Sequence, residues 1–218
     1  MSQRQLDALI FDMGNVLIDW TPSRLVKHFV QDETLIEPLT EAIFHSSEWR
    51  LLDQGLIEES QVIDAVCAQF PRELHPLITD IVTRWPEVNL FDERMIPLTK
   101  ALAKNGTRLY LGSNASLRFH TYKSDLKALE GFDDIQISAD IQISKPDPRF
   151  FEILMSTYGL DPHRTGFIDD VQKNCDSAAT LGITSFHYTK DFKALVDWLI
   201  AQGVLEVQDR VEEIVFLS

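Results

Sequence analysis

Apolar positions along the chain follow two different spacings. Short apolar runs of the kind found in buried strands occur at residues 6–11, 108–112, 135–138, 165–169 and 184–187. Between and after these runs, apolar residues recur at helical intervals, in segments that end at Gly106, Gly159 and Gly182. Strands that alternate with helices predict an α/β fold with a parallel, doubly wound sheet.

Residues 21–85 interrupt this alternation, because they show helical spacing only. Thr21-Pro22 is typical of a helix start, and apolar residues recur at helical intervals within 35–43, 57–70 and 74–85. A domain usually has about 150 residues, so a chain of 218 residues has room for a second, smaller unit. The helical block is its predicted place.

Composition and charge narrow the class of protein. A composition of 44% hydrophobic and 25% charged residues is typical of a globular protein. Its net charge of −14 disfavours nucleic acid and anionic membranes as partners. Cys67 and Cys175 are too few for a zinc site or a disulfide framework. No apolar run reaches the ~18 residues of a membrane span or resembles a secretion signal, so a cytoplasmic location is expected.

Reactive and charged side chains follow the predicted strands. Asp12, Ser113 and the pair Asp169 and Asp170 follow the first, second and fourth runs, and Lys145 lies in a loop after the third. These residues are expected to meet, because the carboxyl ends of parallel strands form the binding edge of such a sheet. Carboxylates there suit Mg²⁺, while a hydroxyl, backbone amides and a lysine can hold phosphate. Asp12 could then attack phosphorus and form an aspartyl-phosphate.

These groups resemble, in order, the four motifs of the haloacid dehalogenase superfamily. The matching segments are Phe11-Asp12-Met13-Gly14-Asn15-Val16, Gly112-Ser113-Asn114, Ser144-Lys145-Pro146-Asp147 and Phe167-Ile168-Asp169-Asp170. The resemblance covers about residues 6 to 190. It implies a Rossmann-like core with a helical cap inserted after the first motif.

The resemblance also implies where the two units divide. Residues 1–18 and 88–218 would form the Rossmann-like core, and residues 19–87 would form the cap. Asp53-Gln54-Gly55, followed by an acidic helix start, is similar to a segment of such caps. The acidic and apolar tail after residue 203 has no predicted place.

The resemblance assigns chemical roles to the motif residues. Asp12 would be the nucleophile, and Ser113 and Lys145 would hold the transferring phosphoryl group. Asn15 and Asn114 are expected to contact the substrate. Their alternative duties are to satisfy the turn after the first strand and to position the loop that carries Ser113.

The metal site implied by the resemblance is a Mg²⁺ site. Its ligands would be Asp12, Asp169 and the main-chain carbonyl of Gly14, with Asp170 as a candidate for a further ligand. Asn174 follows the acids and is expected to support the metal ligands or the lysine. The implied activity is Mg²⁺-dependent hydrolysis of a small phosphorylated metabolite.

Position 14 departs from most phosphatases of this superfamily, which carry there a second Asp that acts as general acid and base. Gly14 has no side chain, and such assistance is typically worth about 10²–10⁴-fold in rate. The enzyme could be slow, or the acid could come from Asp19 or a cap histidine such as His28 or His45. The favoured explanation is a leaving group that needs little protonation, because the first motif most resembles a sugar-1-phosphatase branch with Asp-x-Gly-Asn-Val.

Two other functions remain open on the sequence. A 2-haloacid dehalogenase also lacks the second Asp, but it needs no Mg²⁺ and would leave Asp169 and Asp170 without a purpose. A catalytically silent binding protein would leave Asp12 and Lys145 unused.

Trp20 and Trp49 are expected to pack between cap and core, with closure of the pocket as the alternative.

Overall fold

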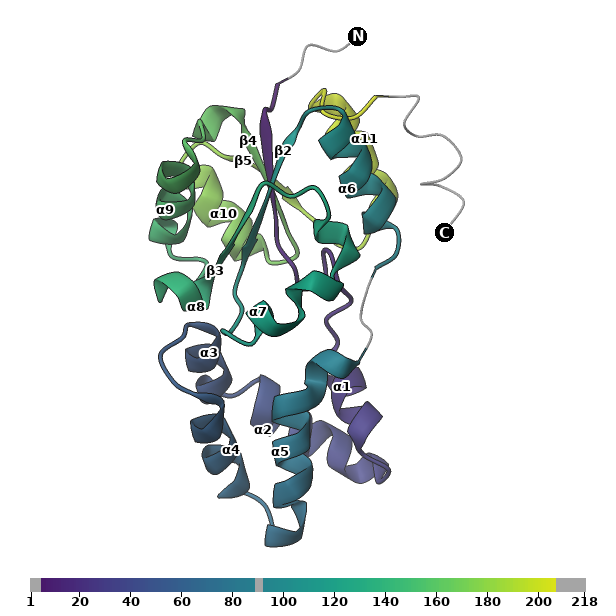
Figure 1. Ribbon diagram of the computed structural model, residues 1–218, viewed down its shortest axis with the longest axis vertical. Coiled ribbons are helices and arrows are strands. Elements are labelled where there is room, and N and C mark those ends of the chain that lie inside the picture. The colour runs from purple at the N-terminus through teal and green to yellow at the C-terminus, as the bar shows by residue number, and fades with distance from the viewer. Residues whose placement is uncertain (1–4, 89–91, 207–218) are drawn as a thin grey trace.

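A computed structural model describes residues 5–88 and 92–206 of the chain, which contain a parallel sheet with helices on both faces (Figure 1). The strands are β1 (Ala8–Phe11), β2 (Arg108–Ser113), β3 (Asp134–Ile137), β4 (Thr165–Asp169) and β5 (Thr184–His187). They lie in the order β3-β2-β1-β4-β5, and every ladder is parallel. The predicted fold class, a Rossmann-like doubly wound sheet, is confirmed.

Successive residues of β1 point to opposite faces of the sheet, and each face has its own core. Leu9 and Phe11 pack in the cluster that includes α6 (Met95–Lys104) and α11 (Phe192–Ala201). Ala8 and Ile10 pack on the other face, against α9 and α10. Those helices span Pro148–Tyr158 and Gln172–Thr180. The central strand is therefore apolar throughout because it is covered on both sides.

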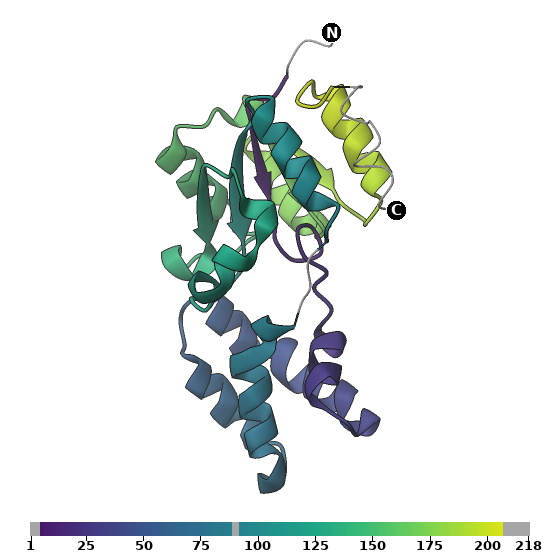
Figure 2. The ribbon, with the colours of Figure 1, turned by 45° about the vertical axis from the view of Figure 1, so that its right-hand side comes forward.

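Five α-helices occupy the described part of the segment between β1 and α6. They are α1 (Pro22–Phe29), α2 (Ile36–Phe44), α3 (Ser47–Asp53), α4 (Glu59–Cys67) and α5 (His75–Arg84). Both ribbon views place this group beyond the end of the sheet at which β1 finishes (Figures 1 and 2). Residues 22–88 contain no strand, as their spacing predicts. The division into a core of 1–18 and 88–218 and a cap of 19–87 stays a prediction.

Several elements are shorter than the sequence predicts. The helix expected over 57–70 is confined to α4, and Pro71 follows soon after its end. Apolar spacing together with Asp92 as a cap predicts a helix over residues 92–105, but α6 begins only at Met95. The Asp92 carboxylate accepts a hydrogen bond from the Arg94 amide at 3.1 Å and holds a turn ahead of the helix.

Short helical segments link the longer elements, and the sequence pattern does not reveal them. Two short α-helices, α7 (Phe119–Tyr122) and α8 (Ser138–Ile141), follow β2 and β3. Single 3₁₀ turns occupy Glu33–Leu35, Arg72–Leu74, Trp85–Glu87, Lys123–Asp125, Lys127–Leu129 and Pro162–Arg164. Most of the tail after residue 203 lies outside the described residues, which end at 206.

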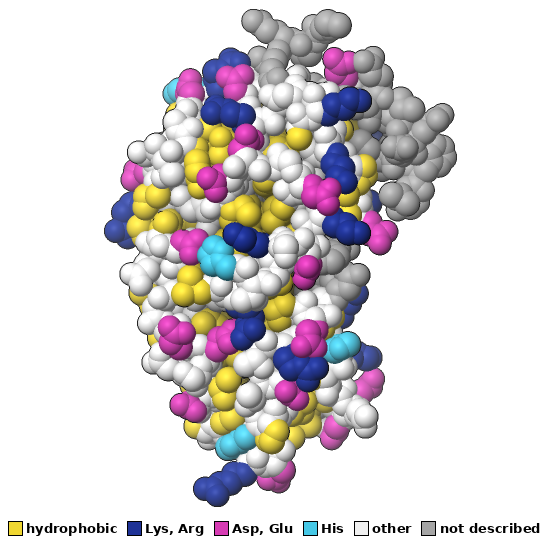
Figure 3. Space-filling view, viewed as in Figure 1, with side chains coloured by type: hydrophobic (Ala, Val, Ile, Leu, Met, Phe, Trp, Pro, Cys, Tyr) yellow, Lys and Arg dark blue, Asp and Glu magenta, His cyan; other side chains and the backbone are white. Residues whose placement is uncertain are grey.

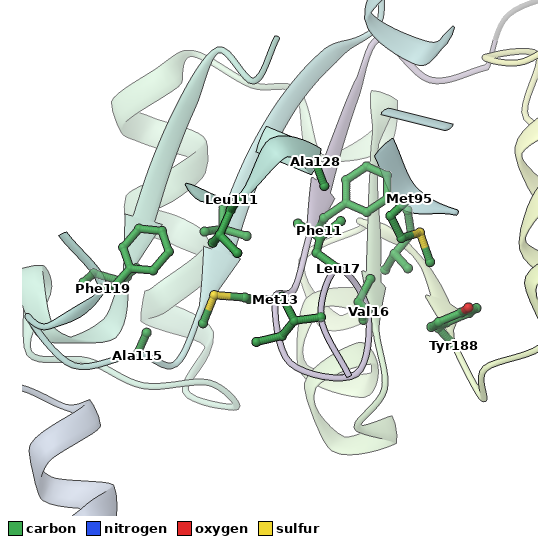
Figure 4. Packing of buried hydrophobic residues seen from close by; sticks show 14 of the residues in the cluster. Phe11, Met13, Val16, Leu17, Met95, Leu111, Ala115, Phe119, Ala128 and Tyr188 are labelled. Carbon is green, nitrogen blue, oxygen red and sulfur yellow. The ribbon is translucent and has the colours of Figure 1, made fainter. Parts of the chain in front are cut away.

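The loop after β1 is anchored by apolar side chains. Met13, Val16 and Leu17 are buried, and Figure 4 shows them gathered with core residues near the end of β1. The amides of Leu17 and Ile18 both donate to the Met13 carbonyl, at 2.9 and 3.0 Å. This anchoring fixes the backbone that follows Asp12.

The end of α3 is attached to the core by hydrogen bonds. The Ser138 hydroxyl donates to the main-chain carbonyl of Asp53. The Gln54 side chain donates to the Gln142 carbonyl at 2.9 Å, and the Gln142 side chain donates to the carbonyl of Gly55 at 3.3 Å. These contacts join α3 to the short helix α8.

Gly55 allows the two backbones to approach this closely. Its φ is +71°, and a Cβ there would lie 2.6 Å from the carbonyl oxygen of Ala139. We expect Gly55→Ala to destabilise the fold by more than the ~1–2 kcal/mol of a left-handed alanine alone, as measured by thermal or urea unfolding. Gly159→Ala is the matched control, because Gly159 has φ +60° and no atom within 4 Å of the added Cβ. Equal losses in the two variants would contradict this account of the close approach.

Charge of both signs is spread over the surface. On the face in Figure 3, basic and acidic side chains alternate over the sheet and the helical group, without a basic patch. In the described part of the chain, the large apolar side chains that are exposed are separate in sequence: Leu51, Leu56, Leu117 and Val171. Among the residues that the structure describes, no helix has the length and apolar character needed to cross a membrane.

Candidate active site

A pocket of about 280 Å³ lies where β1, β2 and β4 end, facing the helical group. Parallel strands bring their carboxyl ends to one edge, so residues from distant parts of the sequence meet there. Seven of the eight residues predicted for the site line the pocket: Asp12, Gly14, Asn15, Ser113, Asn114, Lys145 and Asp170. The eighth, Asp169, is fully buried behind Lys145.

Lys145 joins two of the acids. Its ammonium group donates to Asp12 Oδ1 at 2.8 Å and to Asp169 Oδ2 at 2.7 Å. The lysine side chain is only 1% exposed. Burial opposes the charged form of Lys145, but the two carboxylates outweigh it and raise the pKa of the lysine. The ammonium is therefore a fixed positive charge at the floor of the pocket.

Asp12 carries the opposite electrostatic conflict. Burial raises its pKa to about 6, although Lys145 acts to lower it. The neighbouring charges of Asp169 and Asp170 add to the increase. A cation bound among these acids would favour the carboxylate form of Asp12. The site is thus short of positive charge for the acids it contains.

Three acids form a cluster suited to a metal ion. Asp12, Asp169 and Asp170 each offer a carboxylate oxygen, and these oxygens lie within 4.8 Å of one another. An all-oxygen, anionic ligand set fits a hard divalent cation such as Mg²⁺, which prefers one or more carboxylates together with water and phosphate. Burial also raises the pKa of Asp170.

Neighbouring groups fix the orientation of the two acids that follow β4. Asn174 donates to both carboxylate oxygens of Asp169 at 3.0 Å, and the Val171 amide donates to Asp169 Oδ1 at 2.8 Å. The Asn15 side chain donates to Asp170 Oδ2 at 3.0 Å. Asn174 therefore supports a carboxylate of the cluster, as its place after the acids predicts.

The two predicted substrate contacts are both engaged within the protein. Asn114 donates to the Lys145 carbonyl at 3.0 Å and accepts from the Lys145 amide at 2.9 Å. This reciprocal pair ties the loop after β2, which carries Ser113, to the loop of the lysine. Asn15 holds Asp170 and sits at φ +54°. The geometry of Asn114 matches its alternative duty, whereas the side chain of Asn15 bonds to Asp170 rather than to its own turn. Contact of either residue with substrate stays a prediction.

The alternative acids considered from the sequence lie away from the pocket. Asp19 accepts from Lys190 at 2.6 Å, and this hydrogen bond lowers its pKa, so the group is ionised at neutral pH. Asp19, His28 and His45 are absent from the residues that line the pocket in the described part of the chain. Asp19 instead lines a neighbouring cavity, which shares Asn15 and Ile18 with the pocket.

Aromatic rings form much of the pocket wall above the acids. They are Trp20, Phe44, Trp49, Trp85 and Tyr122. Their ring centroids lie 4.5–6.4 Å apart, and the rings pack edge to face. The two tryptophans noted in the sequence thus pack and also face the pocket. The other three were missed, because aromatic residues at separate places in a helical block give no sign that they converge.

Asp53 is a further acid in this wall. Its side chain is half-buried at the end of α3 and lines the pocket. Burial raises its pKa to about 8, even though hydrogen bonds from the Ser116 amide and the Trp49 indole act to lower it. The i,i+4 spacing of Trp49 and Asp53 was the available signal, since it puts both on one face of a helix.

Fold and site together define a hydrolase with an acid and lysine centre at the edge of a parallel sheet. The chain belongs to the haloacid dehalogenase-like hydrolases, whose family profile matches residues 6–182. A sesquiterpene phosphatase of Aspergillus oryzae is 27% identical over 84% of this chain and 89% of its own length. A drimenol cyclase of Aspergillus calidoustus is 26% identical, and the match covers 84% of this chain but 34% of the cyclase.

Solved structures share the fold at lower identity. A family enzyme of Bacteroides thetaiotaomicron, in complex with magnesium and inorganic phosphate, has a TM-score of 0.68 at 22% identity and covers 87% of this chain and 98% of its own. The L-2-haloacid dehalogenase of Xanthobacter autotrophicus, with chloropropionic acid covalently bound, has a TM-score of 0.65 at 14% identity. That match covers 93% of this chain and 85% of the dehalogenase. An enzyme that binds magnesium and phosphate and a dehalogenase thus share this fold.

Proposed function

We propose that this hydrolase is a Mg²⁺-dependent phosphatase that forms an aspartyl-phosphate on Asp12. The observation that carries the proposal is the cluster of Asp12, Asp169 and Asp170 beside the buried ammonium of Lys145. Attack on a carbon–halogen bond needs no such cation site. The relative named as a phosphatase and the magnesium and phosphate bound to the Bacteroides enzyme support the same function.

The proposed roles of the chain's residues follow from their positions. A carboxylate oxygen of Asp12 attacks phosphorus as the bond to the leaving oxygen breaks. Lys145 and Ser113 hold the phosphoryl oxygens at the floor of the pocket, where their positive charge and hydrogen bond stabilise the transition state. Water then attacks the phosphorus of the aspartyl-phosphate, which releases inorganic phosphate and restores Asp12.

Asp12, Asp169, Asp170 and the Gly14 carbonyl would hold the Mg²⁺. When bound, the ion offsets the negative charge of the phosphate and of the clustered carboxylates. Asn174 and Asn15 keep Asp169 and Asp170 oriented for this role. The acid cluster fits Mg²⁺ because each of its three side chains offers a carboxylate oxygen as a ligand.

Phosphate release from p-nitrophenyl phosphate tests the function. We expect release that depends on Mg²⁺ and is abolished by EDTA. A dehalogenase would instead release halide from a 2-haloacid without metal, and a silent binding protein would do neither. Either of those results would contradict the proposal.

A sugar 1-phosphate is one candidate substrate. Its anomeric oxygen is a better leaving group than an alkyl oxygen, which suits a site where Gly14 supplies no acid. The resemblance of the first motif to a sugar-1-phosphatase branch points the same way. The test compares kcat/KM for glucose 1-phosphate and glucose 6-phosphate, and equal values would contradict the leaving-group argument.

A second candidate is an apolar phosphate monoester, and the five aromatic rings of the pocket wall favour it. When an apolar substrate group packs against these rings, each Å² of apolar surface removed from water contributes about 25 cal/mol to the free energy of binding. The sesquiterpene phosphatase among the relatives makes a terpenyl phosphate the natural probe. Farnesyl monophosphate should be preferred over glucose 1-phosphate if this candidate is right, and the reverse order would favour the sugar.

Gly14→Asp tests whether protonation of the leaving oxygen limits the rate. A Cβ at Gly14 would meet Trp20 at 3.6 Å, which is an ordinary van der Waals contact. If a missing acid limits the rate, kcat for glucose 6-phosphate should rise, by up to the ~10²-fold lower bound of general acid catalysis. Glucose 1-phosphate serves as the internal control, because its leaving oxygen gains less from a proton. An unchanged kcat would mean that another side chain already supplies the proton.

We also propose that residues 19–87 act as a cap that completes the pocket over the core. Support comes from the lining, because Trp20, Phe44, Trp49, Asp53 and Trp85 all belong to this segment. The acids and the lysine belong to the sheet side. In this division the core holds the phosphoryl group and the cap contacts the rest of the substrate.

A further inference from the structure

The proposed reaction still lacks a group to protonate the leaving oxygen. Gly14 occupies the position where most phosphatases of this family carry an acid, and Asp19, His28 and His45 lie outside the pocket. An alkyl phosphate needs such a proton, because an alkoxide is a poor leaving group. The proton must therefore come from another titratable group that lines the pocket.

Among the described residues, six titratable side chains line the pocket: Asp12, Arg50, Asp53, Tyr122, Lys145 and Asp170. Asp12, Lys145 and Asp170 are taken up by the nucleophile, the phosphoryl group and the metal. An arginine does not release its proton in proteins, and burial raises the pKa of Tyr122 above its usual value. Of these six, Asp53 remains as an acid that can give up a proton near neutral pH.

Geometry also places Asp53 on the side where the proton is needed. In phosphoryl transfer the attacking and leaving oxygens are roughly in line through phosphorus. Asp12 attacks from the sheet side, so the leaving oxygen points toward the helical side. Asp53 lines that side of the same pocket, at the end of α3.

The position of Asp53 is fixed by both the cap and the core. Its main-chain carbonyl accepts from the Ser138 hydroxyl, and its carboxyl accepts from the indole of Trp49 and the amide of Ser116. Ser116 lies three residues after Ser113, on the loop that continues from the phosphoryl site. Gly55, with its close approach to Ala139, keeps this end of α3 against the core.

On the basis of the proposed phosphatase function, we propose that Asp53 protonates the leaving oxygen and replaces the acid that Gly14 lacks. As an oxygen of Asp12 bonds to phosphorus and the ester bond breaks, the proton of the Asp53 carboxyl moves to the leaving oxygen. The Asp53 carboxylate then takes a proton from the water that attacks the aspartyl-phosphate. One ester and one water become one alcohol and one inorganic phosphate, and both aspartates return to their starting state.

The protonated state of Asp53 at neutral pH agrees with this role. Burial raises its pKa to about 8, so the Asp53 carboxyl is protonated in most molecules at pH 7. This proton also changes the substrate question. With an acid in the cap, the enzyme is not restricted to esters with good leaving groups, and a terpenyl phosphate becomes as accessible to the chemistry as a sugar 1-phosphate.

A comparison of kcat for two esters of similar size distinguishes a catalytic role of Asp53 from a structural one. In p-nitrophenyl phosphate the leaving group needs no proton, whereas in benzyl phosphate the leaving oxygen is that of an alcohol. We expect Asp53→Asn to lower kcat for benzyl phosphate by about 10²–10⁴-fold, with p-nitrophenyl phosphate changed by only a few-fold. Equal losses for the two esters, or no loss for benzyl phosphate, would overturn the proposal.

Further variants strengthen the test. Gly14→Asp in the Asp53→Asn background should restore part of the benzyl phosphate activity, because it returns an acid to the pocket, and failure of this rescue counts against the proposal. Glu59→Gln is the matched control. Glu59 also joins the two units, through Arg118, but it is outside the residues that line the pocket. It should affect both esters alike.

A measurement on the unmodified enzyme covers the case in which Asp53→Asn does not fold. Across p-nitrophenyl, phenyl and benzyl phosphate, an acid on the leaving oxygen predicts kcat/KM values within about 10²-fold of one another. A steeper decline toward benzyl phosphate would overturn the proposal. If the enzyme releases no phosphate from p-nitrophenyl phosphate with Mg²⁺, the phosphatase function itself fails. That result is distinct from a failure of Asp53 alone.

Discussion

Asp12→Asn should abolish turnover, with a loss of about 10⁴–10⁶-fold in kcat, as is typical when a nucleophile is removed. The amide has nearly the same shape as the carboxylate but cannot act as the nucleophile. The fold should survive, because the carboxylate is buried at a cost in desolvation and Lys145 keeps its bond to Asp169. The measurement is Mg²⁺-dependent phosphate release together with a thermal unfolding curve.

A second readout ties the loss to the covalent step. Acid-quenched enzyme incubated with a ³²P-labelled substrate should carry label on the native chain and none on Asp12→Asn. Asp19→Asn is the matched control, because Asp19 lies nearby in the chain but outside the pocket and pairs with Lys190. Activity retained in Asp12→Asn would show that the nucleophile has been assigned wrongly.

Lys145→Ala should impair both activity and stability. The ammonium is the positive charge of the protein that bridges Asp12 and Asp169, and its loss leaves both carboxylates without this partner. Breaking such a buried pair typically destabilises a protein by about 3–5 kcal/mol. Loss of one charge-stabilising group in a site lowers kcat by about 10²–10³-fold. Urea unfolding in EDTA and phosphate release with Mg²⁺ measure the two effects.

Addition of Mg²⁺ should recover part of the stability but little of the activity of this variant. The ion offers positive charge to the same acids, whereas the phosphoryl contact of the lysine has no substitute. Lys190→Ala is the control, because it also removes a lysine bonded to an aspartate, but on the surface, where the lysine side chain is 55% exposed. Such exposed pairs contribute about 0–1 kcal/mol. Similar losses in the two variants would contradict the special role of Lys145.

The agreement between sequence and structure is best where the signal is local. Apolar runs place all five strands, and glycines such as Gly159, in the left-handed region at the end of α9, mark helix ends. Element boundaries shift where a side chain makes a turn that periodicity does not register. Asp92 does so ahead of α6, because its carboxylate captures the Arg94 amide.

In the candidate site too, some residues can be predicted from local sequence and others cannot. Asp12, Ser113 and Asp169 stand at strand ends, so the rule for parallel sheets alone predicts that they meet. Asn114 is different, because its partner is the main chain of Lys145, 31 positions away. Whether an amide contacts substrate or a distant backbone depends on how two loops pack, and residue spacing within either loop does not specify that.

The sequence by itself determined the α/β fold, the place of the helical insertion and the acids and lysine proposed for the site, because strand alternation and strand-end residues are local properties of the chain. Tertiary structure decided what surrounds them. Five aromatic rings from separate segments line one wall, and Asp53 shares the pocket with Asp12. The position and protonation of Asp53 depend on its burial between the α3 helix and the loop after β2. Burial of this kind arises only when distant segments pack together.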